Sequence, residues 1–365
     1  MKKIILFIIA ALFVSCKKDR VIMPVQDKAL TPKEMILGTW GTKYDKTGFQ
    51  FFTNGACDFK LGFYDYERYK NDYKQKEKVF YSLGTLTKYS ITKDSLKIYN
   101  LSDKKWDSYK VKKLSNDTLV INKNSSWVTF TKKYYDIKNV PDFDAVVVSS
   151  SGCFGSCPIV SMMISKDGCV SYIGSYHTSA KGNYTSKISM KDFNKIALRF
   201  KQADYMKLDN AYGAGTTDGG TVSVLLIKNG KIIKSIEDDG FNIPSEFIWA
   251  YSPLITMYQN LNLVPEKIPD FTNPEFVMAH FNVEGGGLEL TGAEVYYLMY
   301  LLSKGKEVQH TIQEKYYLRL SNNLIDYVKT DGRYYKIYFR DSTFKVIDIG
   351  SDFLKQNKFS KSLTN

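Results

Sequence analysis

Hydrophobic and polar positions alternate along short segments between residues 33 and 135. The alternation is clear in Ser95–Tyr99 and Tyr109–Lys112, and a period of two residues is typical of a strand with one buried face. Turn-forming pairs such as Asn54-Gly55 separate these segments. Strands spaced about ten residues apart, with no helical pattern between them, predict an antiparallel barrel or sandwich.

The pattern changes in a second unit, residues 141–265, where helices join the strands. Ser189 begins a capping pattern and is followed by an apolar stripe at helical spacing, formed by Phe193, Ile196, Ala197 and Phe200. A hairpin is expected next, then a last helix near residues 247–258. Strands and helices do not alternate regularly, so the unit is predicted to be α+β.

Residues 266–365 show a similar mixture. A second capping pattern at Thr291 precedes a helical stripe, and four strands are expected after it. We expect either a small α+β domain or an extension of the preceding unit.

The N-terminus has the pattern of an export signal. Two lysines precede an unbroken apolar run, Ile4–Val14, which is too short to span a bilayer but suits a signal peptide. The run ends in Phe13-Val14-Ser15-Cys16 and resembles the lipobox of bacterial lipoproteins, although Phe13 replaces the usual Leu. The resemblance implies cleavage after Ser15 and acylation of Cys16. Residues 1–15 would then be a signal peptide, and residues 16–32 a lipidated cysteine with its tether.

This resemblance also implies a location. Several acyl chains hold a protein on a membrane, whereas one alone binds marginally. An Asp after the cysteine resembles an inner-membrane retention signal, and Lys17 stands there instead, so we expect lipid anchoring to the outer membrane, facing either side. The alternative is an ordinary cleaved signal peptide with an incidental cysteine.

Net charge narrows the expected partners. The formal charge is +13, and removal of Lys2 and Lys3 with the signal leaves +11. A basic balance suits nucleic acid, anionic lipid or acidic glycan, but export argues against nucleic acid. Because the lysines are spread along the chain, solvated faces are the expected explanation. Besides the membrane, the expected partners are a small hydrophobic ligand or an envelope protein.

A signature near the start of the first unit supports a barrel. Gly38-x-Trp40 on the first expected strand, with the strand spacing after it, resembles the lipocalin-like domains of small bacterial lipoproteins. The resemblance covers residues 33–135 and implies that Trp40 plugs one barrel end. It permits a small apolar ligand inside, although a filled interior fits a short barrel equally well. Residues 63–81 interrupt the pattern, either as a ligand-gripping flap or as a solvated hairpin or helix.

The most distinctive stretch is the run Ser150-Ser151-Gly152-Cys153-Phe154-Gly155-Ser156-Cys157-Pro158. With Lys166-Asp167-Gly168 and Thr217-Asp218 downstream, it is similar to a bacterial domain of unknown function, the family numbered 6438. The resemblance covers the second unit and brings no established activity with it.

Four cysteines remain besides Cys16. An oxidising compartment favours a structural disulfide between Cys153 and Cys157, while a redox-active or metal-binding pair and free thiols remain open. The three-residue gap between them differs from the C-x-x-C of thioredoxin-like proteins. Cys57 and Cys169 are expected to be buried reduced thiols, with a bridge between them as an alternative.

No catalytic constellation is apparent, and no metal or cofactor is expected. His177 shares a unit with Cys157, but nothing local indicates a nucleophile pair. Tyr212 and Asp218 belong to a glycine-rich loop, Tyr212–Thr221, which lacks the Lys-Ser/Thr pair of a phosphate loop. With His177 they form a candidate functional surface. Glu237–Asp239 is expected to be a solvated turn.

The sequence therefore predicts a mainly β protein with α+β units, in which a lipocalin-like antiparallel barrel comes first. Its expected function is that of a membrane-anchored envelope lipoprotein with non-catalytic binding modules. Two alternatives remain: an envelope thiol-redox factor or hydrolase that uses Cys153 and Cys157, and a carrier of a small hydrophobic ligand in the barrel.

Overall fold

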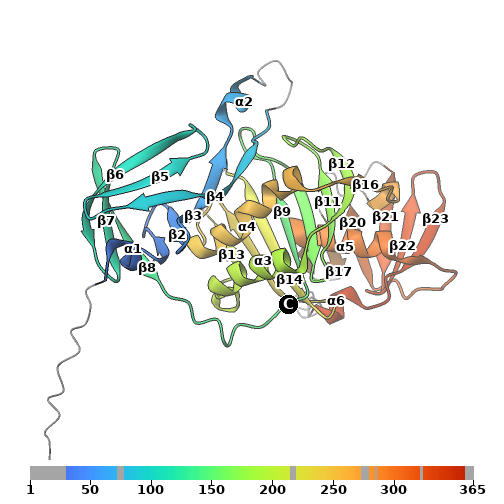
Figure 1. The fold of residues 1–365 in the computed structure, drawn as a ribbon. Coiled ribbons are helices and arrows are strands. Elements are labelled where there is room, and N and C mark those ends of the chain that lie inside the picture. Colours follow the sequence, from blue (N-terminus) through green and yellow to red (C-terminus); the bar gives the residue numbers. More distant parts are fainter. Residues whose placement is uncertain are drawn as a thin grey trace, which may run out of the picture.

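A computed structural model of the chain describes residues 30–71, 78–213, 219–272, 279–283, 286–320 and 324–357. These residues form a barrel, a central sheet and a C-terminal sheet, which follow one another across the molecule in chain order (Figure 1). Within these ranges, no helix combines the length and the apolar character needed to cross a bilayer. The architecture is mainly β with α+β units, as the sequence predicts.

The N-terminal unit is a closed barrel of eight antiparallel strands, so the predicted barrel is confirmed and the sandwich is excluded. Each strand pairs with the next, and the barrel closes where Trp40 on the first strand lies opposite Lys132 on the last. A short helix, α1 (Pro32–Met35), precedes it. The strands are β1 (Gly38–Gly41), β2 (Gly48–Phe51), β3 (Ala56–Tyr64), β4 (Ser82–Ile91), β5 (Ser95–Asn100), β6 (Lys105–Leu114), β7 (Thr118–Lys123) and β8 (Ser126–Lys133).

One end of this barrel is filled. Trp40 is fully buried, and its indole Nε1 donates a hydrogen bond to the carbonyl oxygen of Ile36, 2.6 Å away and just past α1. Apolar side chains pack around it, and the most deeply buried include Phe51, Cys57, Leu96, Leu119 and Phe130. Trp40 thus closes this end of the barrel from the inside.

The central sheet has eight strands in the order β13-β15-β14-β9-β10-β11-β12-β16. Its middle strand, β9, contains the unbroken apolar run Ala145–Val148, which is buried on both faces; such a run indicates cover on both sides of a sheet. The strands are β9 (Ala145–Ser150), β10 (Val160–Ser165), β11 (Cys169–Gly174), β12 (Gly182–Lys187), β13 (Ala211–Tyr212), β14 (Thr221–Lys228), β15 (Lys231–Asp239) and β16 (Val264–Pro265).

Two helices, α3 (Met190–Gln202) and α4 (Ser245–Met257), cover one face of the central sheet. The side chain of Ser189 caps α3 by accepting a hydrogen bond from the backbone N–H of Asp192, as its sequence pattern predicts. The predicted apolar stripe of α3 points into the core shared with the sheet. The described residues also include the short 3-10 helices η2 (Tyr205–Lys207), η3 (Tyr258–Asn260) and η4 (Asp270–Thr272).

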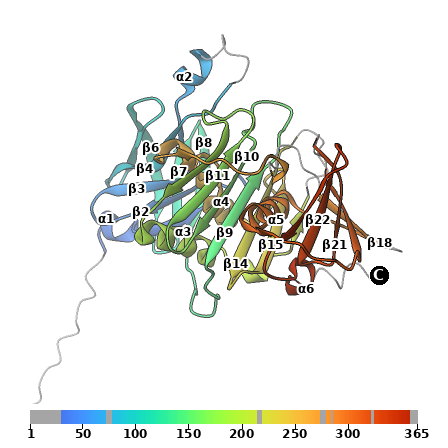
Figure 2. The same ribbon diagram turned by 90° about the vertical axis from the view of Figure 1, so that its right-hand side faces the viewer.

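The other face of the central sheet packs against α5 (Gly292–Lys304) and the C-terminal sheet, and Figure 2 shows α5 between the two sheets. One hydrophobic cluster contains Val147 and Leu225 of the central sheet, Leu298 of α5, and Val328 and Ile337 of the C-terminal sheet. The second and third units therefore share a core. The C-terminal elements are β17 (Ala279–Val283), β18 (Gly286–Glu289), β19 (Lys306–Glu307), β20 (Tyr316–Leu320), β21 (Ile325–Thr330), β22 (Tyr334–Phe339), β23 (Phe344–Asp348) and α6 (Phe353–Gln356).

The barrel docks on α4 through Trp249. The indole Nε1 of Trp249 donates a hydrogen bond to the carbonyl oxygen of Lys46 at 2.8 Å. A Cβ at Gly48 would lie 2.3 Å from the indole ring, so only glycine permits this close approach.

A buried ion cluster joins the same two units. Asp58 on the outside of the barrel accepts hydrogen bonds from Lys60 at 2.8 Å and from Arg199 of α3 at 3.1 Å. Burial alone would raise the pKa of Asp58, but the two cations hold it below its usual range. Asp58 therefore stays ionised between the barrel and α3.

The segment that interrupts the barrel pattern includes a short helix, α2 (Tyr66–Asn71). The ring of Tyr69 stacks on that of Phe80 at 4.4 Å, and the Tyr69 hydroxyl donates to Ser156 of the central domain at 3.4 Å. The carbonyl oxygen of Lys78 lies 3.0 Å from Nδ1 of His177. The segment thus contacts the central domain beyond the barrel.

Candidate functional site

The open end of the barrel, opposite Trp40, contains a cavity of about 630 Å³. Its volume lies within the range of small-ligand pockets, about 300–1,000 Å³. The deeper wall is apolar and aromatic, and its residues are Phe49, Phe59, Ile98, Ile121 and Phe130. These side chains come from five different strands, so barrel closure itself brings them together.

The mouth of this cavity is polar. The side-chain N–H of Asn100 donates to the Asp107 carboxylate at 3.0 Å, and Asp107 also bonds the hydroxyl of Tyr109. Burial and the neighbouring carboxylate raise the pKa of Tyr109 to about 12, so its hydroxyl stays protonated at neutral pH. Lys123 supplies the single basic side chain among the lining residues. Asn100 and Tyr109 thus hold the Asp107 carboxylate in place at the mouth.

The rim combines aromatic surface with these polar groups. Tyr66 at the start of α2 and Trp106 of β6 both line the mouth, and each has nearly half of its surface exposed to solvent. An aromatic wall below a ring of amide, carboxylate and ammonium groups suits a small amphipathic molecule.

Cys153 and Cys157 form a disulfide, with their Cα atoms 5.6 Å apart. The bridged loop contains Ser156, which Tyr69 of α2 contacts. The bridged loop lies against the glycine-rich segment, where a Cβ at Gly220 would meet Cys157 Sγ at 3.6 Å. Phe154 at the tip of the loop is 90% exposed. The bonded sulfurs leave neither cysteine available as a nucleophile or a metal ligand in this state.

Beside this loop, a cleft of about 510 Å³ lies between the central sheet and the start of α5. Ser161, Ser149, Ser223 and Glu237 are in register across four neighbouring strands and face it. The Ser149 and Ser161 hydroxyls are 2.8 Å apart, and Ser223 accepts a hydrogen bond from the backbone N–H of Ala293. Part of this row therefore caps α5.

The expectation that Glu237–Asp239 forms a solvated turn is wrong, because β15 continues through it. Asp238 is 1% exposed and accepts a 2.7 Å hydrogen bond from the Tyr251 hydroxyl. Burial, with Glu289 and Asp239 nearby, raises the pKa of Glu237. Single-residue patterns do not show this arrangement, because it depends on strand register.

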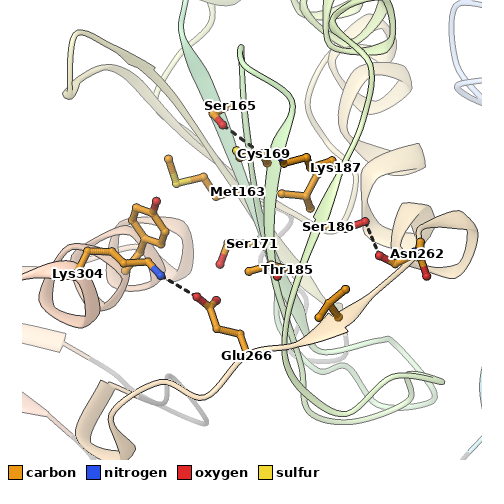
Figure 3. A pocket seen from close by; sticks show the side chains of 13 residues that line it. Met163, Ser165, Cys169, Ser171, Thr185, Ser186, Lys187, Asn262, Glu266 and Lys304 are labelled. Carbon is orange, nitrogen blue, oxygen red and sulfur yellow. Dashed lines mark hydrogen bonds and ion pairs between the residues drawn. The ribbon is translucent and has the colours of Figure 1, made fainter.

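A third groove, of about 600 Å³, lies between β11, β12 and α5 (Figure 3). The ammonium of Lys304 bonds the Glu266 carboxylate at 2.7 Å across one side of it. Cys169 also lines the groove and is exposed, which corrects the expectation of a buried thiol. Desolvation and a hydrogen bond to Asp167 raise the pKa of Cys169, so its reactive thiolate is disfavoured. Cys57 is buried in the barrel core and forms no bridge with Cys169.

The remaining sequence candidates do not converge on one site. Tyr212 pairs in β13 with Asp238, and its hydroxyl accepts from the backbone N–H of Asp209. His177 lies in the turn between β11 and β12 with φ at 52°. Asp218 and Cys16 lie outside the described residues. Within the described ranges, no group of three His, Cys, Asp or Glu side chains is arranged to hold a metal ion.

Comparison with solved structures shows only distant similarity. The DNA polymerase sliding clamp of Pseudomonas aeruginosa has 6% identity and a TM-score of 0.15, over 86% of this chain and 91% of the clamp. The Helicobacter pylori beta clamp bound to a DNA ligase peptide has 8% identity and a TM-score of 0.13, over 85% and 90%. These scores are too low to indicate a shared fold.

No curated protein is significantly similar to the chain. One family model does match, and it covers the strands β9 to β15, the helices α3 and α4 and the Cys153–Cys157 loop. The barrel and the C-terminal sheet lie outside it. Residues 144–258 are a domain of the family described as Domain of unknown function (DUF6438).

Proposed function

We propose that the protein is an exported lipoprotein, anchored through acyl chains on Cys16, whose barrel binds a small amphipathic molecule. The observation that carries the binding role is the cavity of about 630 Å³ at the barrel mouth, with its aromatic wall and polar rim. The anchor rests on the lipobox-like sequence that ends at Cys16.

The structure favours ligand binding in the barrel over the alternatives. A completely filled barrel would offer no space for a ligand, whereas here only the Trp40 end is filled. A hydrolase that uses Cys157 would require a free thiol, and this sulfur is bonded to Cys153. A redox role requires that the bridge open readily. We expect it instead to resist mild reductant, as thiol counting by mass spectrometry would show.

Binding can be tested with the apolar fluorophore N-phenylnaphthylamine. Lys123 points into the barrel mouth, since it shares the inward face of β7 with Ile121. The variant Lys123→Trp should fill the mouth and lower the affinity for the probe at least tenfold. Lys110→Trp, on the outer surface of β6, is the matched control and should bind like the native chain. Equal affinity in both variants, or no binding by the native chain, would overturn the proposal.

The anchor requires a separate test. Mass spectrometry of the mature protein should show a chain that begins at Cys16 and carries acyl mass. Cys16→Ser should abolish the acyl mass and release the protein from membrane fractions. A native chain recovered without lipid would show that this part of the proposal is wrong.

A further inference from the structure

The net charge of the chain is concentrated in the barrel. Residues 33–135 contain 20 Lys and Arg against 11 Asp and Glu, a net charge of +9. Residues 136–365 contain 25 basic and 25 acidic residues and are neutral overall. Lysines do occur along the whole chain, but acidic residues balance them only outside the barrel. Ordinary solvated faces do not account for this asymmetry.

Within the barrel, the asymmetry is sharpest on β4 to β8. These five strands contain one acidic residue, Asp107, and it lines the cavity. The other carboxylates in this part of the chain are confined to the turns between strands, and they belong to Asp94, Asp103 and Asp117. The outer surface of the five strands is therefore free of strand carboxylates.

Lysines and tryptophans occupy that outer surface. Three outward-facing side chains lie side by side on β4, β5 and β6, and they belong to Lys88, Tyr99 and Trp106. The same outer face of β5 and β6 also carries Lys97 and Lys110. The Lys112 ammonium is 5.4 Å from the ring of Trp127 on β8. We call this set the basic face, and its members are Lys88, Lys97, Trp106, Lys110, Lys112 and Trp127.

The groups of the basic face are accessible to a partner. Trp106 and Trp127 are 48% and 49% exposed. Among the described residues, no carboxylate forms an ion pair with Lys88, Lys97 or Lys110. Figure 1 shows β6 and β7 at the end of the molecule that lies farthest from the C-terminal sheet. Neither the central domain nor the C-terminal sheet covers this part of the barrel.

We propose that the basic face docks the barrel onto the anionic phospholipid headgroups of the membrane in which the acyl chains are inserted. Lysines gain free energy near an anionic bilayer surface, and tryptophan prefers the membrane–water interface. The barrel is also the unit next to Cys16, since Leu30 follows 14 residues later, which span at most about 50 Å. The inference rests on the proposed anchor, and Trp106 places the cavity mouth beside the headgroups.

The experiment uses a chain that begins at residue 17, which lacks the acyl chains and retains every described element. Sedimentation with vesicles containing phosphatidylglycerol should show binding that weakens with salt, and pure phosphatidylcholine vesicles should bind little. If Cys16 is not acylated, this vesicle binding should still be observed. If the basic face does not bind vesicles, the acyl mass on Cys16 should still be found. The two failures are therefore distinguishable.

Charge reversal then locates the surface. The triple variant Lys97→Glu, Lys110→Glu and Lys112→Glu should lower the affinity for anionic vesicles at least 100-fold, since each lysine near the surface contributes about fivefold and the new carboxylates add repulsion. The matched control is Lys166→Glu, Lys191→Glu and Lys231→Glu, with the same charge change on exposed lysines of the central domain. It should lose much less affinity. Circular dichroism establishes that both variants fold.

Three outcomes would overturn the proposal: equal loss in the two triple variants, equal binding to the two vesicle types, or tight binding to duplex DNA with none to vesicles. Brominated lipids provide a second measurement that does not depend on charge reversal. They should quench the fluorescence of a Trp127-containing chain more than that of Trp127→Phe. Equal quenching would place the indole away from the bilayer.

Discussion

The barrel and the rest of the molecule use their apolar residues differently. In the barrel, side chains fill the end around Trp40 and leave a cavity at the other end. The central sheet is covered on both faces, by α3 and α4 on one side and by α5 with the C-terminal sheet on the other. The barrel is also strongly basic, whereas the remainder is neutral. In the function that we propose, the barrel presents surfaces to ligand and membrane, and the rest of the molecule forms a scaffold.

The largest expected effect tests whether the central and C-terminal sheets form one scaffold. Leu298 of α5 is fully buried in the cluster that joins them. Leu298→Ala should lower the free energy of unfolding by about 4 kcal/mol, from lost apolar contact and the cavity left behind. Hydrogen exchange should show that β9 and β22 lose protection together while the barrel strands retain it.

The control for this prediction is Leu198→Ala on α3, where the side chain is 42% exposed. Leu198→Ala should change the free energy of unfolding by no more than about 0.5 kcal/mol. If only the C-terminal sheet loses protection from hydrogen exchange, the two sheets do not share a core. The C-terminal residues would then form an independent domain.

The next effect concerns the junction between barrel and scaffold. Lys60→Met removes one of the two cations that bind buried Asp58, and it should cost about 3 kcal/mol because a buried charge loses a partner. Urea unfolding measures the loss. The two cations lower the pKa of Asp58 in the folded state. The stability that this ion cluster contributes is therefore fully present above the pKa of Asp58 in the unfolded chain, and it is lost as the pH falls through the pKa of Asp58 in the folded chain.

Combining Asp58→Asn with Lys60→Met provides the control for the junction, since it removes the carboxylate along with its partner. This double variant should recover most of the lost stability. If it is no more stable than Lys60→Met, the cost arises from packing of the lysine stem and the electrostatic account is wrong.

The smallest effect belongs to the serine-lined cleft of the scaffold. The pKa of Glu237 is raised in the folded state, so its unfavourable contribution appears as pH rises above the unfolded value near 4.5. Glu237→Gln should therefore stabilise the protein at pH 7 by less than about 1 kcal/mol, since the side chain is only half-buried. At pH 4 and below, the urea midpoints of variant and native chain should converge. A midpoint that rises equally at both pH values would exclude charge as the cause.

The sequence predicts most of the strands and the starts of α3 and α5 because these depend on local periodicity and capping. Ser189 and Thr291 cap α3 and α5 where their patterns indicate. The sequence gives less information about the core that the central and C-terminal sheets share. The unbroken apolar run in β9 indicates a sheet covered on both faces, but it does not show which elements cover it.

The cavity and the polar clusters were beyond sequence reasoning because they depend on tertiary packing and strand register. How far the barrel is filled follows from the joint packing of side chains from several strands, such as Phe59 and Ile121. The prediction of a solvated turn at Glu237–Asp239 is wrong because Asp238 accepts a buried hydrogen bond from Tyr251, thirteen residues away on α4. Cys169 begins the strand β11, but strand position alone does not determine exposure.

The most direct test of the central claim is native mass spectrometry of the protein purified from its own envelope in mild detergent. We predict a species heavier than the acylated chain by the mass of one bound small molecule, and loss of that mass in Lys123→Trp. A native chain that carries its acyl groups and no other ligand, in preparations where the fold is intact, would contradict a ligand-binding role for the barrel.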